Sequence, residues 1–266
     1  MNAFIPSLCL LLVLGAVHAE PAADPASAWK MASTFQFNEA RDAFVIATGD
    51  EAMRKFGEAA TLLNVQPRTG GNIQRARRLF EEVARDTPPG SKLSRLSRFY
   101  IARVKEFYLA PQDIEGATAD YLSLLQEKTA DPLIEQGASR LVVIAAFSGG
   151  TPADRLQKLA ALEKLDSLLE TPAGRREFHT SMAYALLDNG GDKSRAVDHF
   201  LAADREGFTR KATAVSAWLV AATTAAEIGR NIDARYFFEK MLATYPQDPR
   251  NFTVRSLLGR LGPDNG

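Results

Sequence analysis

The sequence is poor in the residues that build disulfides and metal centres. It has 266 residues, a single cysteine at Cys9, and three histidines. One cysteine excludes an intramolecular disulfide framework, so the fold must be stabilised mainly by burial of apolar side chains. Lys plus Arg and Asp plus Glu both number 32, which gives a formal net charge of zero. The overall charge therefore gives no argument for binding nucleic acid or an anionic lipid surface.

Recognised catalytic and metal-binding motifs are also missing from the sequence. The histidines are His18, His179 and His199, and none belongs to a paired-ligand motif such as HExxH. A zinc site needs three or four ligands, so a surface position or packing between helices is the expected role of His179 and His199. The Gly-Gly pairs at 70–71 and 149–150 lack the Lys-Ser/Thr ending of a phosphate-binding loop. We therefore predict no catalytic residues, no cofactor and no metal.

The first 19 residues contain no Asp, Glu, Lys or Arg and include an apolar run from Phe4 to Val17. Val17, His18 and Ala19 form a small-x-small pattern that is typical of a secretory signal peptide cleaved after Ala19. A membrane anchor is the alternative, but a span needs about 20 apolar residues, and Pro6 interrupts this run. No later segment of the sequence is long and apolar enough to span a membrane. We expect an exported protein, periplasmic or secreted, without stable membrane insertion after cleavage.

The rest of the chain has the composition and periodicity of an all-α protein. Ala, Leu, Arg, Glu and Lys, which favour helices, dominate, and no run alternates apolar and polar residues with a period of two. Turn residues separate segments of roughly 12 to 20 residues with apolar positions at helical spacing. This pattern predicts antiparallel helices joined by short loops. We divide the chain into the signal peptide at 1–19, a flexible leader at 20–27, one helical-repeat domain at 28–262 and a flexible tail at 263–266.

One pattern of small, aromatic and turn residues recurs along the chain. Its clearest copy has Gly229 in a turn, Ala234 and Phe238 on the next helix, and Pro246 after that helix. An alanine lets two helix backbones approach closely, and an aromatic residue one turn later fills the space between units. The successive alanines are 36, 41, 79 and 38 residues apart, and the step of 79 leaves room for a degenerate unit at Leu156–Leu169. The other alanine–aromatic pairs are Ala40 and Phe44, Ala76 and Phe80, Ala117 and Tyr121, and Ala196 and Phe200.

The repeating unit resembles the tetratricopeptide repeat, whose first helix carries a Trp-Leu-Gly-Tyr-like motif and whose second helix carries an Ala-Phe-Ala-Pro-like motif. Trp218 and Ala222 match the first helix, and Ala234, Phe238 and Pro246 match the second. The positions that depart from the motif are Ala225, where a tyrosine is usual, and Met241, where a small residue is usual. The resemblance implies an all-α, right-handed superhelical stack of about five antiparallel helix pairs, a TPR-like solenoid.

The resemblance also implies where a ligand binds. In this family, ligands lie in the groove formed by the first helices of successive units. A capping helix from Pro249 to about Leu261 is expected to end the stack. The predicted function is an exported, non-enzymatic scaffold or adaptor that binds a protein or peptide, and no nucleic acid, in this groove. The candidate groove residues are Phe99, Ala102, Glu106, Phe178, Ser181, Ala185, Asp188, Ser216, Leu219 and Thr223.

Two other classes of function stay open. The first is an accessory module of the cell envelope that binds glycan or peptidoglycan, or assists an envelope hydrolase. The second is an enzyme in its own right, which needs polar groups clustered in one pocket. The carboxylates are scattered along the chain, and nothing in their spacing argues for an acid pair of the glycosidase kind.

Charge is distributed unevenly along the chain. Residues 68–105 hold ten Lys or Arg and three acids, whereas residues 113–170 hold ten acids and five bases. A solvated basic helix face is the simpler interpretation of the first segment. Bases next to exposed aromatic residues are alternatively suited to binding an acidic peptide or a glycan. The bases in question are Arg95, Arg98, Arg103 and Lys105, and the aromatic residues are Phe99, Tyr100, Phe107 and Tyr108.

Overall fold

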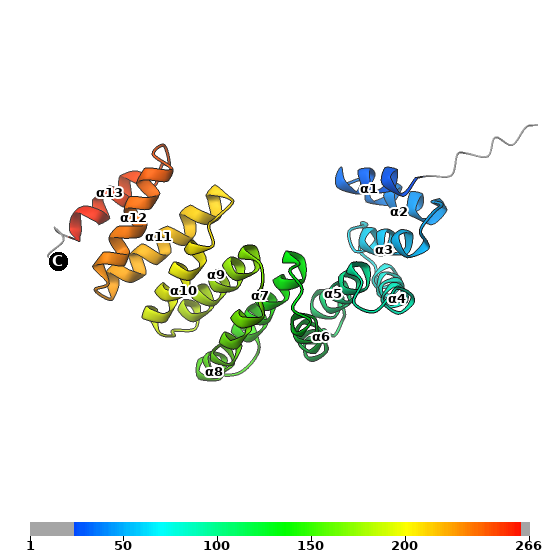
Figure 1. Ribbon diagram of the computed structural model, residues 1–266, viewed down its shortest axis with the longest axis horizontal. Helices are drawn as coiled ribbons and strands as arrows, with labels where there is room; N and C mark the ends of the chain where they lie inside the picture. Colours follow the sequence, from blue (N-terminus) through cyan, green and yellow to red (C-terminus); the bar gives the residue numbers. More distant parts are fainter. Residues whose placement is uncertain (1–23, 262–266) are drawn as a thin grey trace, which may run out of the picture.

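The computed structural model describes residues 24–261, which form thirteen α-helices and one 3-10 helix, η1, with no β-strand in this range (Figure 1). The all-α prediction is confirmed. The expected signal peptide at 1–19 and tail at 263–266 lie outside the described residues. No helix between residues 24 and 261 has the length and apolar character needed to cross a membrane. The helices are α1 (Pro25–Ser33), α2 (Phe37–Ile46), α3 (Glu51–Leu62), α4 (Gly70–Asp86), α5 (Lys92–Phe107), α6 (Ile114–Gln126), α7 (Pro132–Phe147), α8 (Pro152–Leu162), η1 (Glu163–Leu168), α9 (Pro172–Asp188), α10 (Lys193–Arg205), α11 (Lys211–Glu227), α12 (Asn231–Thr244) and α13 (Asn251–Arg260).

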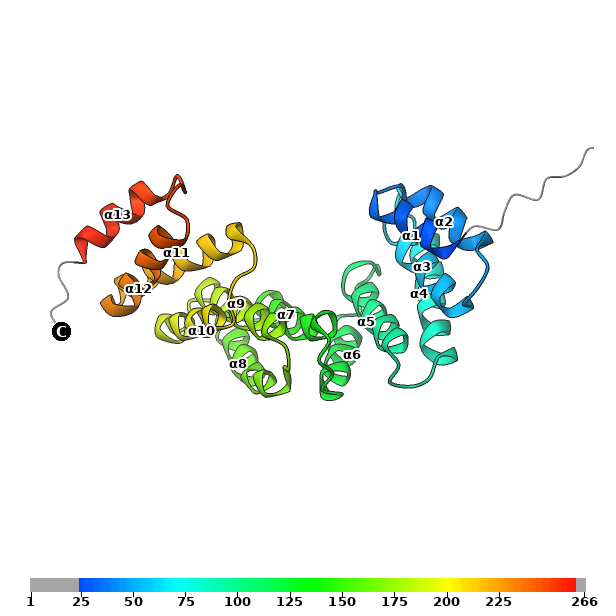
Figure 2. The ribbon, with the colours of Figure 1, turned by 45° about the horizontal axis from the view of Figure 1, so that its top comes forward.

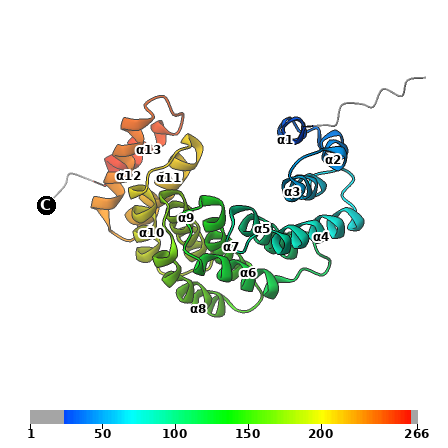
Figure 3. The same ribbon diagram turned by 45° about the vertical axis from the view of Figure 1, so that its right-hand side comes forward.

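The helices follow one another in chain order along a curved row, with α1 and α13 at opposite ends (Figure 1). Each α-helix packs against the next one in the chain. Helices α1, α3, α5 and α7 each also contact the next odd-numbered helix. Figure 3 shows α5, α7, α9 and α11 on the inner side of the curve, and α4, α6, α8 and α10 on the outer side. We call these sides the inner face and the outer face.

The repeated alanine and aromatic residues lie in the core, on α2, α4, α6, α10 and α12. All five alanines are 0 % exposed, and their aromatic partners are at most 1 % exposed. The long step between two of the alanines is filled by α8 and η1, which bury Leu159 and Leu165 instead. The described chain therefore forms six successive helix pairs before α13, whereas about five were expected. The pair that includes α8 corresponds to the degenerate unit expected at Leu156–Leu169, and it lacks the alanine–aromatic signature.

The first helix begins within the stretch that was expected to be a flexible leader, residues 20–27. It starts at Pro25, because the Asp24 side chain accepts a hydrogen bond from a backbone N–H of the first turn (3.1 Å) and proline suits the first helical position. Trp29 then packs edge-on against Phe44 of α2, with ring centroids 5.0 Å apart. This aromatic contact packs α1 against α2. The helical part of the chain therefore begins at Pro25, within the stretch that was expected to be flexible.

The last helix covers the C-terminal end of the row, as the expected capping helix would. It begins at Asn251, two residues after Pro249. The Asn251 side-chain amide donates to the backbone carbonyl of Tyr245 (2.8 Å), which closes the loop that follows α12. Val254 of α13 is 0 % exposed and packs into the apolar core formed with α11 and α12. The helix therefore buries the apolar side of the last helix pair.

Candidate functional site

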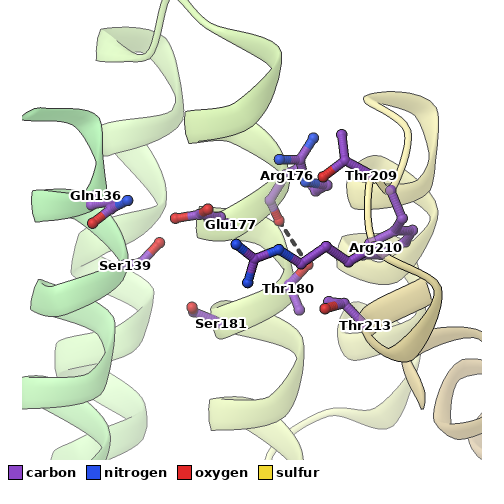
Figure 4. Close-up of a pocket in the computed structure, with 10 residues that line it drawn as sticks. Gln136, Ser139, Arg176, Glu177, Thr180, Ser181, Thr209, Arg210 and Thr213 are labelled. Atoms are coloured by element: carbon purple, nitrogen blue, oxygen red, sulfur yellow. Dashed lines mark hydrogen bonds between the residues drawn. The ribbon is translucent and has the colours of Figure 1, made fainter. Parts of the chain in front are cut away.

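The inner face carries a polar pocket of about 430 Å³ between α7, α9 and the start of α11 (Figure 4). We call it the inner pocket. Its side chains come from three parts of the chain that are separate in sequence and that the row of helices brings together. They are Gln136 and Ser139 of α7, Arg176, Glu177, Thr180 and Ser181 of α9, and Phe208, Thr209, Arg210 and Thr213 of the α10–α11 loop and the first turn of α11.

Buried Glu135 fixes the start of α9 against α7. It is 2 % exposed, and its carboxylate accepts hydrogen bonds from the backbone N–H groups of Glu170 (2.7 Å) and Thr171 (3.1 Å) and from the Thr171 hydroxyl. The Thr171 hydroxyl in turn accepts from the Gly174 N–H (3.0 Å) and so caps α9. A Cβ at Gly174 would overlap the Glu135 carboxylate, which explains the glycine. These contacts position the first turns of α9, which carry four of the pocket residues.

The inner pocket combines two guanidinium groups with a half-buried carboxyl group. Arg176 Nη1 donates to the carbonyl oxygen of Gly207 (2.8 Å) and holds α9 to the α10–α11 loop. Arg210 extends from that loop toward α9, and Glu177 points toward α7 (Figure 4). Burial raises the pKa of Glu177, and the charges of Arg176 and Arg210 oppose that shift. Two bases and one acid give the pocket an excess of positive charge, which favours an anionic group on its ligand.

Hydroxyl and amide groups supply the remaining polar atoms of the inner pocket. The Ser139 hydroxyl oxygen is buried and makes no hydrogen bond within residues 24–261. The Thr180 hydroxyl donates to the backbone carbonyl of Arg176 (2.7 Å), one turn earlier in α9. The lining includes neither histidine nor cysteine. The arrangement is suited to hydrogen bonding and ion pairing with a polar ligand.

Five of the ten predicted groove residues are buried between helices rather than exposed on the inner face. Phe and Ala are among the residue types most often fully buried in folded proteins, and four of the five are of these types. The fifth, Glu106, accepts a hydrogen bond from the Tyr121 hydroxyl (2.8 Å) and one from Arg140 Nε (3.1 Å). The buried residues, each at most 5 % exposed, are Phe99, Ala102, Glu106, Phe178 and Ala185.

Of the other five predicted residues, only Ser181 lines the inner pocket. Asp188 and Ser216 are exposed, and Leu219 and Thr223 are half-buried, all outside this pocket. The prediction followed the aromatic side of α9, which faces the core. A signal for the pocket was present in the sequence next to Phe178. It is a stripe of polar residues at helical spacing, formed by Arg176, Glu177, Thr180 and Ser181.

Two of the bases of α5 pair with acids in the segment that follows it. Arg98 pairs with Glu127, the residue that directly follows α6, and Lys105 Nζ lies 2.7 Å from the carboxylate of Asp120 of α6. Arg103 lies over the Phe107 ring, 5.6 Å from its centroid. The uneven charge of the sequence is therefore matched between neighbouring helices. This leaves less free positive charge on α5 than its composition indicates.

The two histidines within the described residues contact each other between α9 and α10. Their Nδ1 atoms are 2.9 Å apart. His179 Nε2 lies 3.2 Å from Asp166, without hydrogen-bond alignment, and His199 Nε2 lies 3.4 Å from Glu163. Burial lowers the pKa of both rings, although the two carboxylates act in the opposite direction. Residues 24–261 contain no group of three or more His, Cys, Asp or Glu side chains placed to hold a metal ion.

Comparisons with known proteins add no family to these observations. No protein-family model matches the chain, and no curated protein matches it either. The interpretation of function therefore depends on the row of helices and on the chemistry of the inner pocket.

Proposed function

We propose that the protein is a non-enzymatic scaffold that binds a protein or peptide partner on its inner face. The inner pocket is the observation that carries this proposal, because it gathers charged and polar side chains from three successive inner helices. Its volume of about 430 Å³ lies in the range of specific binding pockets, about 300–1,000 Å³. The two arginines favour an acidic segment of the partner, and Glu177 offers an acceptor for its N–H or O–H groups.

The architecture that we propose is a superhelix similar to tetratricopeptide-repeat proteins. Two observations support it: the contacts between successive odd-numbered helices, and the alanine–aromatic pair that is buried on five of the second helices. In such an array each unit buries its apolar side only against its neighbours. The inner face would then be preformed, and a partner would bind with little change in the backbone.

The proposed location is the periplasm or the outside of the cell. The apolar N-terminal segment and the cleavage pattern ending at Ala19 support export. Cys9 lies within that segment, so cleavage would leave a chain without a thiol. The expected partner is accordingly a protein of the cell envelope.

A crosslinking pulldown from native envelopes tests the proposal with a matched pair of charge reversals. Arg210→Glu changes an exposed pocket arginine, whereas Arg78→Glu makes the same change at an exposed position of α4. We expect Arg210→Glu to lose the partner and Arg78→Glu to retain it. Equal capture by the two variants would contradict binding at the inner pocket.

A second candidate function is binding of glycan or peptidoglycan, in an accessory protein that serves an envelope hydrolase. The hydroxyl and amide groups of Gln136, Ser139, Ser181 and Thr213 favour it, because sugars are held by many such hydrogen bonds. Cosedimentation with purified sacculi distinguishes this candidate from the first. Sedimentation that Arg210→Glu abolishes would favour glycan, and failure to sediment would leave the protein-binding function.

A further inference from the structure

Two adjoining cavities, both bordered by α6 and α7, are separate from the inner pocket. The first, of about 550 Å³, lies between α6, α7 and α8, and the second, of about 460 Å³, lies between the end of α5, α6 and the end of α7. Both are lined by Ile114, Ile144 and Ser148, so they meet at a common wall. Figure 2 shows α6 and α8 on either side of α7. We call the pair of cavities the outer groove.

The lining of the outer groove is mainly apolar, and several of its polar side chains already have hydrogen-bond or ion-pair partners. Thr118 donates to the backbone carbonyl of Ile114 (2.8 Å), and Ser148 to that of Ala145 (3.3 Å). Arg140 is held by Glu106. A peptide backbone bound here would lose its hydrogen bonds to water and find few replacements. A hydrocarbon chain has no such loss, so the chemistry of the lining favours it.

A cation stands at the edge of the groove on the α8 side. Lys158 is exposed, and its Nζ lies 2.9 Å from the Ser148 hydroxyl and 3.5 Å from the Gly149 carbonyl. An ammonium group has three N–H donors and stays accessible to a second acceptor at such an exposed position. Glu115 is the acid on the opposite, α6 side of the groove. Within the first cavity an anionic group is therefore favoured on the Lys158 side.

We propose that the outer groove binds a single-chain amphiphile, with its tail among the apolar residues and its anionic head at Lys158. The tail would contact Ile114, Leu141, Ile144 and Leu162, which line the first cavity. Phe147, which is 72 % exposed at the edge of the second cavity, gains burial when the groove is filled. The site does not depend on the function proposed for the inner pocket.

Fluorescence titration of the full chain with 11-(dansylamino)undecanoic acid tests the proposal, with saturated fatty acids as competitors below their micelle concentrations. We expect saturable binding at one site. Competition by octanoate, decanoate and dodecanoate should strengthen by about fourfold for each added methylene until the groove is full. Failure to saturate, or competition that is independent of chain length, would overturn the proposal.

Substitutions at the two edges of the groove, on α6 and on α8, test whether the amphiphile binds there. Ala161→Trp on α8 and Glu115→Trp on α6 are at exposed positions, so the core is left intact while the indole fills the groove. Each should remove binding of the dansyl probe with an unchanged far-UV circular dichroism spectrum, whereas Arg210→Glu in the inner pocket should have no effect. Unchanged probe binding in both tryptophan variants would refute the assignment of the groove.

The head group is tested by comparing decanoate with decanol as competitors. Lys158→Met should lower the affinity for decanoate by about two- to fivefold, the range for an exposed ion pair. The affinity for decanol should not change. Lys164→Met, an exposed control on η1 outside the groove, should alter neither. An equal effect of Lys158→Met on decanoate and decanol would overturn the position of the head.

Discussion

Replacing Glu135 by alanine removes a buried acceptor that three hydrogen-bond donors share. The donors are two backbone N–H groups and the Thr171 hydroxyl at the start of α9. Hydrogen bonds to a charged group contribute about 1.5–3 kcal/mol each to stability. Because water replaces part of these bonds where the donors are half-exposed, we expect the free energy of unfolding to fall by about 3 kcal/mol in total. In a domain of this size that loss lowers Tm by about 6–12 °C.

Thermal unfolding followed by circular dichroism at 222 nm measures the effect. Glu170→Ala is the matched control, because it removes an exposed carboxylate at the same helix start and should change the free energy of unfolding by no more than about 0.5 kcal/mol. Since α9 carries Arg176 and Glu177, Glu135→Ala should also weaken partner capture at the inner pocket. A Tm equal to that of the Glu170→Ala control would refute the anchoring role of Glu135.

Three further changes test the packing between helices. The free energy of unfolding should rise with pH between about 5 and 7. Burial lowers the pKa of His179 and His199, so the unfolded chain binds more protons than the folded chain in this range. Denaturant titrations should show a smaller rise in the double variant His179→Phe/His199→Phe, and a rise equal to that of the unsubstituted protein would contradict the reasoning. Ala234→Trp forces an indole into a position that is 0 % exposed. It should lower Tm by several degrees relative to the control Ile232→Trp, whose site is 73 % exposed. Equal melting temperatures of the two variants would contradict the repeat packing. Asp204→Ala leaves three hydrogen-bond donors of α11 and α12 without their buried acceptor. It should lower the free energy of unfolding, measured in urea, by about 3 kcal/mol. A change within error of zero would show that the network does not stabilise the fold.

The helical class of the fold could be predicted from the sequence because its signals are local. Helix formers, turn residues and caps act within a few residues of one another, as Asp24 and Pro25 do at the start of α1. The alanine–aromatic pairs added a longer period, and their burial in the structure agrees with the packing role predicted for Ala234 and Phe238. The pair that includes α8 has a weaker signal in the sequence, since it is filled by leucines and continues into η1.

The inner pocket could not be predicted to the residue, because its geometry depends on the rotation of each helix. One residue along a helix changes the direction of a side chain by about 100°, so the prediction that selected Phe178 missed Glu177 beside it. Arg210 comes from a loop whose path is set by tertiary packing. The partners of Glu106 lie on α6 and α7, and no local pattern in the sequence shows that this acid is buried.

The most direct test of the central claim is site-specific photo-crosslinking from inside the inner pocket. A p-benzoylphenylalanine at Thr213, which lines the pocket, is compared with one at Gln74, an exposed position of α4. The proposed function predicts a discrete adduct with an envelope protein from position 213 that is absent from position 74 and disappears when Arg210→Glu is added. Adducts of equal yield from both positions, or an adduct from position 213 that survives Arg210→Glu, would contradict partner binding at the inner pocket.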